Sequence, residues 1–218
     1  MVRSTTVVTL ALFASAACAS APQGAASGQS ASTSASVTAS ADTTPHAYTA
    51  ADVEFMNGMI SHHAQALLMA GWAESHGASP TIMTLTGRIT NAQKDEIVAM
   101  QKWLRDRHLP VPEPNPHGMT MNMGGMQHEM LMPGMLTEDQ LKQLDAARSK
   151  EFDRLFLTFM IQHHQGAVTM VNNLFNTNGA AQDISVYKLA SDVSADQTTE
   201  IERMQKMLAS MVFSTDTP

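Results

Sequence analysis

The chain has 218 residues and a net charge of -7, and 44% of its residues are hydrophobic while only 5% are aromatic. We therefore expect one modest domain with an aliphatic, methionine-rich core. Charged residues make up 15% of the chain and no cluster of lysine or arginine occurs, which argues against a nucleic-acid-binding surface.

Residues 1–18 have the pattern of an export signal. A short basic segment, Met1-Val2-Arg3, precedes an apolar stretch from Val7 to Ala17. No later stretch reaches the roughly 20 apolar residues that a membrane span requires. We therefore predict export to the periplasm or the cell surface, with no transmembrane helix in the mature protein.

The only cysteine, Cys18, follows this apolar stretch. A bacterial lipoprotein would be cleaved and acylated at such a cysteine, but the small residues around Cys18 also suit ordinary signal cleavage. Lipid anchoring at Cys18 and free secretion both stay open, and membrane contact is expected only through such an anchor. The folded part contains no cysteine, so disulfides and thiolate metal sites are excluded there.

Residues 19–47 consist mostly of Ala, Ser, Thr and Gly and lack the branched apolar side chains that build a core. We predict a disordered tether there. A helical domain follows over residues 48–213, and it contains an internal repeat. In the first helix of each half, Asp52, Phe55, Met59, Ile60, His62, His63, Ala66 and Met69 match Asp153, Phe156, Met160, Ile161, His163, His164, Ala167 and Met170.

The repeat continues into a second helix of each half, and the two helices of a half are joined by a turn. Ser79-Pro80 is typical of a helix N-terminus, and Gly179 marks the equivalent turn in the second half. We predict an all-α four-helix bundle of two helix pairs, over residues 48–107 and 137–213, whose apolar stripes pack together. The matched residues of the second helices are Gln93, Glu96, Ile97, Met100 and Leu104, which correspond to Gln197, Glu200, Ile201, Met204 and Leu208.

The connection between the halves, residues 108–136, is rich in Pro, Gly and Met. It shows no helical or strand period, so we predict a loop. A loop of this length in a compact domain is usually functional or disordered. Thr137 and Gln140 then form a capping box that predicts a short extra helix at the start of the second half.

Each repeat brings one thioether and two imidazoles together on a helix. Met59 lies three and four residues before His62 and His63, and Met160 stands in the same relation to His163 and His164. Thioether sulfur selects Cu(I), and imidazole binds either oxidation state of copper. We therefore predict copper sites there, with silver as a second ion. Further side chains that could complete or orient these sites are Asp52, Met56, Glu96, Met100, Asp153, Glu200 and Met204.

Methionine also fills cores, and a buried histidine is often simply hydrogen-bonded. We interpret the remaining helical methionines as core residues: Met69, Met83, Met170, Met207 and Met211. The duplicated Met-x-x-His-His pattern favours metal, because burying imidazoles without a partner costs free energy.

Seven of the 18 methionines fall between residues 117 and 135 of the connection. Core packing does not account for them there, so their polarisable sulfur is the better explanation. A Met-rich interaction surface and an oxidation sink are the alternatives. The predicted metal ligands of this segment are His117, Met119, Met121, Met123, Met126, His128 and Met130.

Two segments of the second repeat, Glu151 to Leu157 and Met160 to Ala167, resemble the signature of the family called domain of unknown function 305, and Asp52 to Ala66 resembles a first copy of it. The resemblance implies a ferritin-like fold, export, and copper binding like that of periplasmic copper metallochaperones. It implies metal binding through Met59, His62, His63, Met160, His163 and His164. The first copy has Asn57-Gly58 and Gln65 where the second has Thr158-Phe159 and Gly166, so we expect its site to be looser.

We therefore predict an exported copper-binding protein that sequesters or delivers Cu(I) or Cu(II). Its expected partners are the metal ion and a copper exporter or another periplasmic copper protein. Two alternatives are a ferritin-like redox enzyme that uses a bound metal and a helical interaction module that binds no metal. The chain contains no Glu-x-x-His, His-Glu-x-x-His or Gly-x-Ser-x-Gly motif, so we expect no enzymatic activity.

Overall fold

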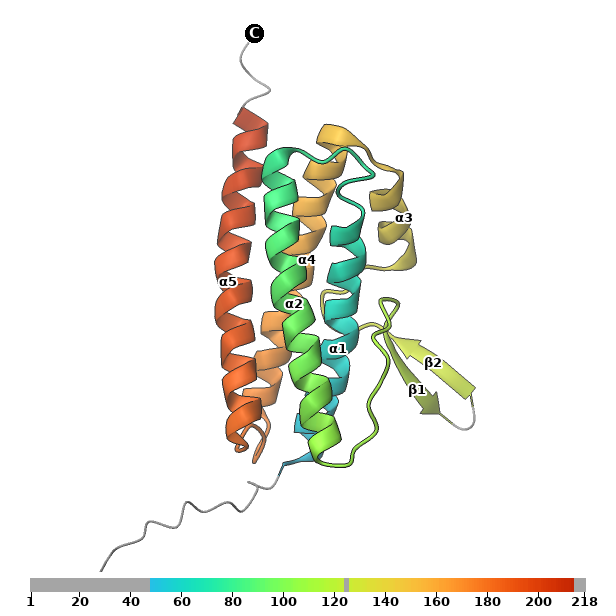
Figure 1. Cartoon of the computed structure of the whole chain (residues 1–218), viewed down its shortest axis with the longest axis vertical. Coiled ribbons are helices and arrows are strands. Elements are labelled where there is room, and N and C mark those ends of the chain that lie inside the picture. The colour runs from blue at the N-terminus through green and yellow to red at the C-terminus, as the bar shows by residue number, and fades with distance from the viewer. Residues whose placement is uncertain (1–47, 124–125, 214–218) are drawn as a thin grey trace, which may run out of the picture. The chain divides into compact units, whose positions relative to one another are not determined.

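The computed structural model describes residues 48–123 and 126–213. The predicted signal segment, the tether and Cys18 lie outside these residues and stay predictions. The described elements are α1 (Ala50–Gly71), α2 (Pro80–Asp106), β1 (Met119–Met123), β2 (Met126–Met130), α3 (Glu138–Ala146), α4 (Ser149–Asn176) and α5 (Ile184–Phe213) (Figure 1).

Local capping fixes where three of the helices begin. The Ser79 hydroxyl accepts a hydrogen bond from the Ile82 amide, and Pro80 occupies the first turn of α2, as predicted. Thr137 and Gln140 form the predicted capping box of α3. Thr49 and Asp52 form a second capping box at the start of α1, which the sequence analysis did not identify.

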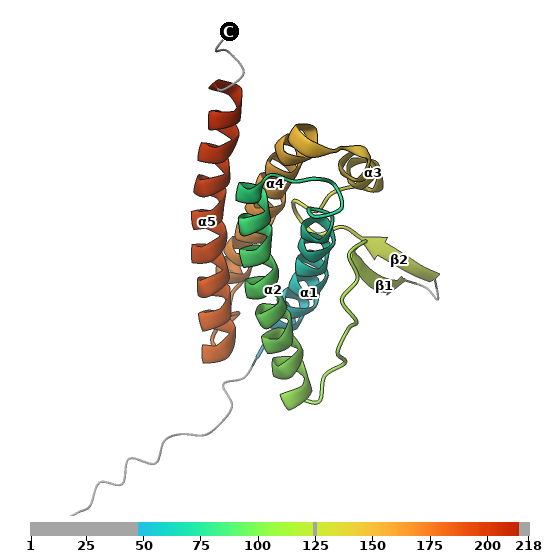
Figure 2. The same ribbon diagram turned by 45° about the horizontal axis from the view of Figure 1, so that its top comes forward.

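The four long helices form the predicted bundle of two helix pairs. Helix α1 packs on α2, α4 packs on α5, and α1 joins the halves by packing on α4 (Figures 1 and 2). Asp153 near the start of α4 contacts Ser79 at the start of α2, so these two helices run in the same direction. The connection from α2 to α4 therefore crosses the length of the bundle. A bundle with one such crossover has the ferritin-like topology.

The crossover is more ordered than the predicted loop. Strands β1 and β2 pair in antiparallel fashion and form a hairpin, which projects from the α1 side of the bundle, away from α5 (Figure 2). The expectation that this segment has no strand pattern was therefore wrong for residues 119–123 and 126–130. Methionines and one histidine alternate with polar residues there, and two glycines separate the two runs in the sequence, which is a hairpin pattern.

The interior of the bundle divides into two apolar clusters with polar residues between them. The first cluster includes Ile89 and Phe156, and the second includes Ile60, Ile97 and Val171. On each long helix, polar residues at matched positions of the repeat lie between the residues of the two clusters. We call this set the polar layer, and it consists of His62, His63, Gln93, Glu96, His163, His164, Gln197 and Glu200.

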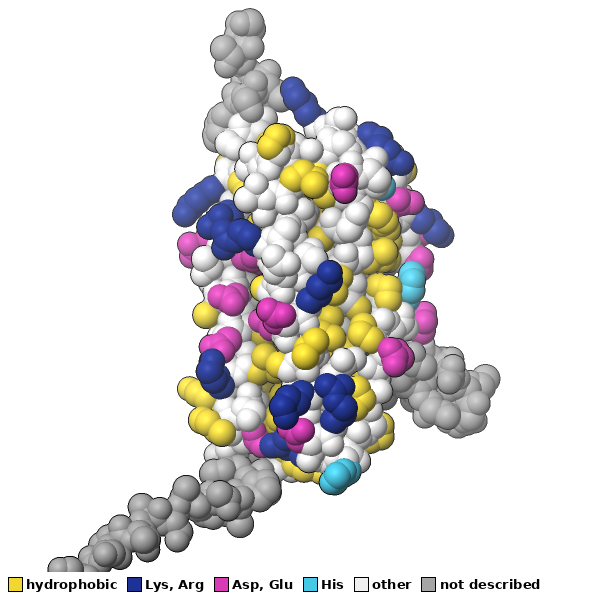
Figure 3. All heavy atoms as spheres, in the orientation of Figure 1, with side chains coloured by type: hydrophobic (Ala, Val, Ile, Leu, Met, Phe, Trp, Pro, Cys, Tyr) yellow, Lys and Arg dark blue, Asp and Glu magenta, His cyan; other side chains and the backbone are white. Residues whose placement is uncertain are grey.

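Acidic and basic side chains are interspersed over the face seen in Figure 3, and apolar side chains lie among them. No helix among the described residues is long and apolar enough to cross a membrane. Of the methionines interpreted as core residues, Met69 and Met170 are buried, whereas Met83 is 38% exposed and does not belong to the core.

Candidate metal-binding site

The polar layer places all four repeated histidines inside the bundle. His62, His63, His163 and His164 have no measurable exposed surface. Gln93 and Gln197, which occupy equivalent positions of α2 and α5, are buried as well. Such a concentration of buried polar groups is unusual in a small helical bundle, because each one must recover the hydrogen bonds that it loses from water.

One histidine of each repeat is paired with a glutamate of the neighbouring helix. The Nε2 atom of His63 lies 2.7 Å from Oε2 of Glu96, and Nε2 of His164 lies 2.8 Å from Oε2 of Glu200. The two pairs occupy equivalent places in the two repeats. Both carboxylates are largely buried, so each pair is shielded from solvent.

The other two histidines lie against each other at the contact between α1 and α4. The ring centroids of His62 and His163 are 3.8 Å apart, with a 38° angle between the ring planes. Nε2 of His62 donates to the Pro133 carbonyl, and Nε2 of His163 donates to the His62 carbonyl, each over 3.0 Å. This pair of rings therefore links both repeats and the crossover.

These contacts fix the tautomer of the neutral rings. Every Nε2 atom faces a carbonyl or carboxylate oxygen, which can only accept a hydrogen bond, so Nε2 must carry the proton. Each Nδ1 atom then has a lone pair, and all four Nδ1 atoms are buried without a hydrogen-bond partner among the described residues. A neutral imidazole whose Nε2–H is held by an oxygen and whose Nδ1 is free has the arrangement of a metal ligand.

Burial also favours the uncharged form of three of these rings, those of His62, His163 and His164. Burial, reinforced by neighbouring His63, lowers the pKa of His62 to about 3. The pKa of His163 falls well below its usual value for the same reason, with His62 as its strongest neighbour. Burial lowers the pKa of His164 too, although Glu200 partly opposes this shift. Neutral imidazole is the form that binds metal ions.

A third carboxylate, that of Asp196, lies near the glutamates of the two histidine–glutamate pairs. Burial and the nearby charges of Glu96 and Glu200 raise the pKa of Asp196. The two glutamates, from α2 and α5, therefore lie close to the same third carboxylate. This concentration of negative charge favours a cation in the polar layer.

Buried methionines adjoin the polar layer within one helical turn on both sides. Met59 and Met100 belong to the second apolar cluster, and Met160 and Met204 belong to the first. All four are fully buried, as is Met56. The predicted thioethers therefore neighbour the histidines along their helices, where they also serve as core residues.

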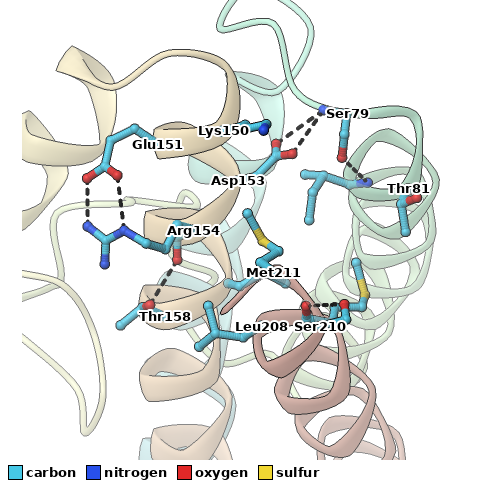
Figure 4. A pocket seen from close by; sticks show the side chains of 13 residues that line it. Ser79, Thr81, Lys150, Glu151, Asp153, Arg154, Thr158, Leu208, Ser210 and Met211 are labelled. Carbon is cyan, nitrogen blue, oxygen red and sulfur yellow. Dashed lines mark hydrogen bonds and ion pairs between the residues drawn. The ribbon is translucent and has the colours of Figure 1, made fainter. Parts of the chain in front are cut away.

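The two predicted aspartates have other partners. Asp52 accepts hydrogen bonds from the Thr49 amide and from the Ala181 amide at the turn between α4 and α5, each over 2.7 Å. Asp153 accepts a hydrogen bond from the Ser79 amide at the equivalent turn of the first repeat (Figure 4). Each aspartate thus ties the start of one repeat's first helix to the turn of the other repeat.

The cavity drawn in Figure 4 has a volume of about 830 Å³ and lies around the starts of α2 and α4. It is lined by Asp153, Arg154 and Met211, and by none of the layer histidines. Among the described residues, no three His, Cys, Asp or Glu side chains stand close enough to hold a metal ion by themselves.

The crossover is fastened to the bundle beside the histidines. Met132 to Met135 form a tight turn with Gly134 at φ +77°, and the Met135 amide donates to the Met132 carbonyl. A Cβ added to Gly166 of α4 would lie 1.9 Å from the Pro133 oxygen, so only glycine allows this contact. The Gln65 side chain of α1 donates to the carbonyls of Pro116 and Leu136 and accepts a hydrogen bond from the Leu136 amide. It therefore binds two separate parts of the crossover.

The hairpin arranges the predicted ligands of the crossover in pairs. Met119 stands opposite Met130, Met121 opposite His128, and Met123 opposite Met126. Opposed residues and residues two apart share one face of a ladder, so these six register positions belong to one face. His117 lies just before the hairpin, is exposed, and contacts Glu138 through Nδ1.

The structure thus brings the four repeated histidines, both glutamates and the nearby methionines into one region. It sets the two aspartates apart at the turns and the hairpin ligands outside the bundle. The sequence analysis missed four contributors, which are Gln65, Gln93, Gln197 and the Pro133 carbonyl. The two glutamines of the layer were visible as matched positions of the repeat.

The fold and the polar layer together define a four-helix bundle with a histidine-containing interior. Residues 52–208 match the family described as Domain of unknown function (DUF305), and the chain belongs to this family. A DUF305 protein of Streptomyces coelicolor, whose secretion is predicted, has a similar crystal structure. It is 27% identical with a TM-score of 0.62, and the match covers 74% of this chain and 93% of that one.

A protein called CopM, whose structure in the Cu(I)-bound form is known, is also similar. The two are 28% identical with a TM-score of 0.55, and the match covers 73% of this chain and 96% of that one. CopM has also been solved with Cu(II) and with silver. These relatives indicate metal binding at the level of the family.

An uncharacterised protein of Acanthamoeba polyphaga mimivirus, L153, is 36% identical over 58 residues. That match covers 27% of this chain and spans only 38% of the viral protein.

Proposed function

We propose that this protein binds Cu(I) through the imidazoles of the polar layer and nearby thioethers, and that it sequesters or delivers copper outside the cytoplasm. The observation that carries the proposal is the set of four buried Nδ1 atoms without hydrogen-bond partners. Leaving a polar atom unpartnered in the interior costs about 1–3 kcal/mol. A bound metal ion would recover that cost.

The types of ligand support copper over harder ions. Imidazole nitrogen and thioether sulfur suit Cu(I) and Ag(I), whereas Mg²⁺ and Ca²⁺ require oxygen ligands. Met59 and Met160 neighbour the histidines on their helices, and the hairpin supplies a second group of thioethers. The metal-bound forms of CopM support the same choice of ions for this family. Cu(II) could use the imidazoles alone.

The two groups of ligands suit different steps. The polar layer is buried and its rings are held by hydrogen bonds, so it suits tight retention of an ion. The hairpin projects from the bundle and suits capture from solvent or from a partner protein (Figure 1). A copper exporter or another periplasmic copper protein is the proposed partner. No step of this function requires turnover of a substrate.

A competition titration against a chromogenic Cu(I) chelator tests the proposal. One variant replaces His62, His63, His163 and His164 with asparagine, and another lacks residues 117–135. We expect the first to lose its tightest Cu(I) equivalent and the second to lose weaker ones. The control is His76→Asn, since His76 is also buried but both of its ring nitrogens have partners. Unchanged Cu(I) binding in both variants would overturn the proposal.

Export is the second part of the proposal. It is supported by the pattern of residues 1–18 and by the predicted secretion of the Streptomyces relative. The mass of the mature protein, purified from cells that express the full chain, tests it. A lipid mass on Cys18 that disappears in Cys18→Ser would show anchoring, and an unmodified chain that begins after this region would show free secretion. Retention of residues 1–18 would contradict export.

A further inference from the structure

A groove of about 280 Å³ separates the chain that leaves β2 from helices α1 and α4. Three methionines from separate parts of the sequence line it. Met130 ends β2, Met132 begins the tight turn of the crossover, and Met170 lies on α4. The groove is distinct from the polar layer, which contributes no residue to its lining.

We infer that this groove is a second soft-metal site, in which the thioethers of Met130, Met132 and Met170 bind one Cu(I) or Ag(I) ion. Three thioethers form a ligand set for a soft monovalent cation, and hard cations have little affinity for them. The inference rests on the proposed function, because it adds a step to the handling of the same ion.

Two of the three side chains lie against the same point of α1. A Cβ added to Gly58 would lie 2.9 Å from the Met132 sulfur and 3.3 Å from the Met170 terminal methyl. Gly58 therefore lets both methionines approach the helix backbone and each other. The equivalent residue of the second repeat is Phe159, which leaves no such space. Gly58, from which the sequence analysis expected a looser site in the first repeat, thus provides the space that the groove requires.

The three thioethers span the distance from solvent to the core. Met130 is 43% exposed, Met132 is half-buried, and Met170 is only 8% exposed. Leu131, between the first two, is exposed as well. An ion that enters from solvent needs an accessible first ligand, and the exposed Met130 at the edge of the groove provides one.

The groove also lies between the other two groups of ligands. Met130 is paired with Met119 in the hairpin ladder. Pro133 lines the groove, and its carbonyl accepts the Nε2–H of His62 over 3.0 Å. An ion held by the three thioethers would thus stand between the hairpin and the polar layer. Its passage exchanges thioether ligands for imidazole ligands, and the oxidation state of the ion does not change.

Methyl NMR of the full chain, with ¹³C-labelled methionine methyls and Ag(I) as a redox-inert probe, tests this site. Single Met→Leu variants assign the three resonances. We expect the methyls of Met130, Met132 and Met170 to shift together over one equivalent of Ag(I). The triple variant M130L/M132L/M170L should bind one equivalent less, and the control Met69→Leu, a buried residue of the other cluster, should bind as the parent does.

A second variant tests the geometry without removing a ligand. Gly58→Ala favours the helix by about 1 kcal/mol but displaces the Met132 sulfur. We expect unchanged helix content and a loss of Ag(I) affinity at the groove. If the three methyls do not shift with Ag(I), or if the triple variant keeps the full stoichiometry, the groove is not a metal site.

The outcome is separable from that of the proposed function. In the variant that lacks the four layer histidines, the three methyls should still shift with Ag(I). Loss of the tightest equivalent in that variant, together with unchanged binding in the triple methionine variant, would leave the polar layer as the site and overturn the groove alone.

Discussion

At the scale of single residues, the histidines of the polar layer combine features that oppose stability with features that suit a ligand. Their Nε2 atoms are hydrogen-bonded, and their Nδ1 atoms are not. Complete hydrogen bonding would have made a more stable interior. The retained free nitrogen is therefore best explained by a ligand that occupies it.

Stability should fall in acid because of these rings. The unfolded His62 side chain gains a proton near pH 6.5, whereas the folded one resists protonation down to about pH 3. Between these values the unfolded state binds more protons, so the free energy of unfolding should fall by about 1.4 kcal/mol per pH unit for each such histidine. It should be insensitive to these groups above pH 7.

Urea unfolding of the metal-free protein between pH 7 and pH 4 measures this slope. His163 has a lowered pKa for the same reason. The slope of the free energy of unfolding with pH should therefore be smaller in H62N/H163N, by the contribution of two protons. An identical slope in the double variant and the parent would show that other groups cause the acid sensitivity.

Asp52 should be a structural residue. Its carboxylate accepts hydrogen bonds from the amides of Thr49 and Ala181. We therefore expect Asp52→Ala to lower the free energy of unfolding by about 2 kcal/mol. Cu(I) affinity, measured well below the melting temperature, should stay within about twofold if the carboxylate is no ligand. Asp192→Ala is the control for stability, since Asp192 forms an exposed ion pair with Lys188 and should change the free energy of unfolding by less than about 0.5 kcal/mol.

At the scale of secondary-structure elements, the crossover depends on one glycine of α4. Gly166→Ala would place a Cβ against the backbone of Pro133 and Gly134, which cannot rotate away as a side chain can. We expect the turn to move off the helix, with a loss of about 1–3 kcal/mol and of the hydrogen bond to His62. Faster hydrogen exchange at the Met135 and Leu136 amides would report this movement.

Gly87 provides the matched control. It also lies within a helix, but a Cβ there would contact nothing within 4 Å, so Gly87→Ala should stabilise the protein by about 1 kcal/mol. If the two variants behave alike, the turn is not held by close contact with Gly166.

The sequence predicts those elements whose signals are local. The caps at Ser79 and Thr137 use residues three positions apart, and the repeat identifies the four helices and the matched histidine pairs. The hairpin was missed because methionine is not a typical strand former, and its alternation was attributed to sulfur chemistry alone. Contacts such as Gln65 with Leu136 depend on how the crossover returns to the bundle, which no local pattern specifies.

For the candidate site, the repeat matched the histidines and glutamates of the two halves, but the burial of all four histidines inside the bundle required the structure. The repeat did not indicate that Asp52 and Asp153 serve the turns, because an equivalent position in a repeat preserves structural contacts as well as ligands. The tautomers of the histidines depend on backbone carbonyls from other elements, so they required the structure.

At the scale of the whole molecule, two similar halves enclose the polar layer, and one crossover breaks their equivalence. The crossover packs where the halves differ, at Gly58 and Gly166. Capture and transfer of an ion should therefore proceed on that side only. The proposed retention site inside the bundle, by contrast, should keep the equivalence of the two repeats.

The two histidine–glutamate pairs test this equivalence. Their hydrogen bonds, 2.7 Å and 2.8 Å, and their burial are nearly the same, so Glu96→Gln and Glu200→Gln should weaken Cu(I) binding equally. Loss of a carboxylate that supports a ligating imidazole typically costs 10–100-fold in affinity, and we expect about tenfold for each variant. Glu202 lies on α5, as Glu200 does, but is exposed, so Glu202→Gln should leave the Cu(I) affinity unchanged. A large loss in only one of the two variants would mean that a single repeat holds the metal and that the other copy of the motif is structural.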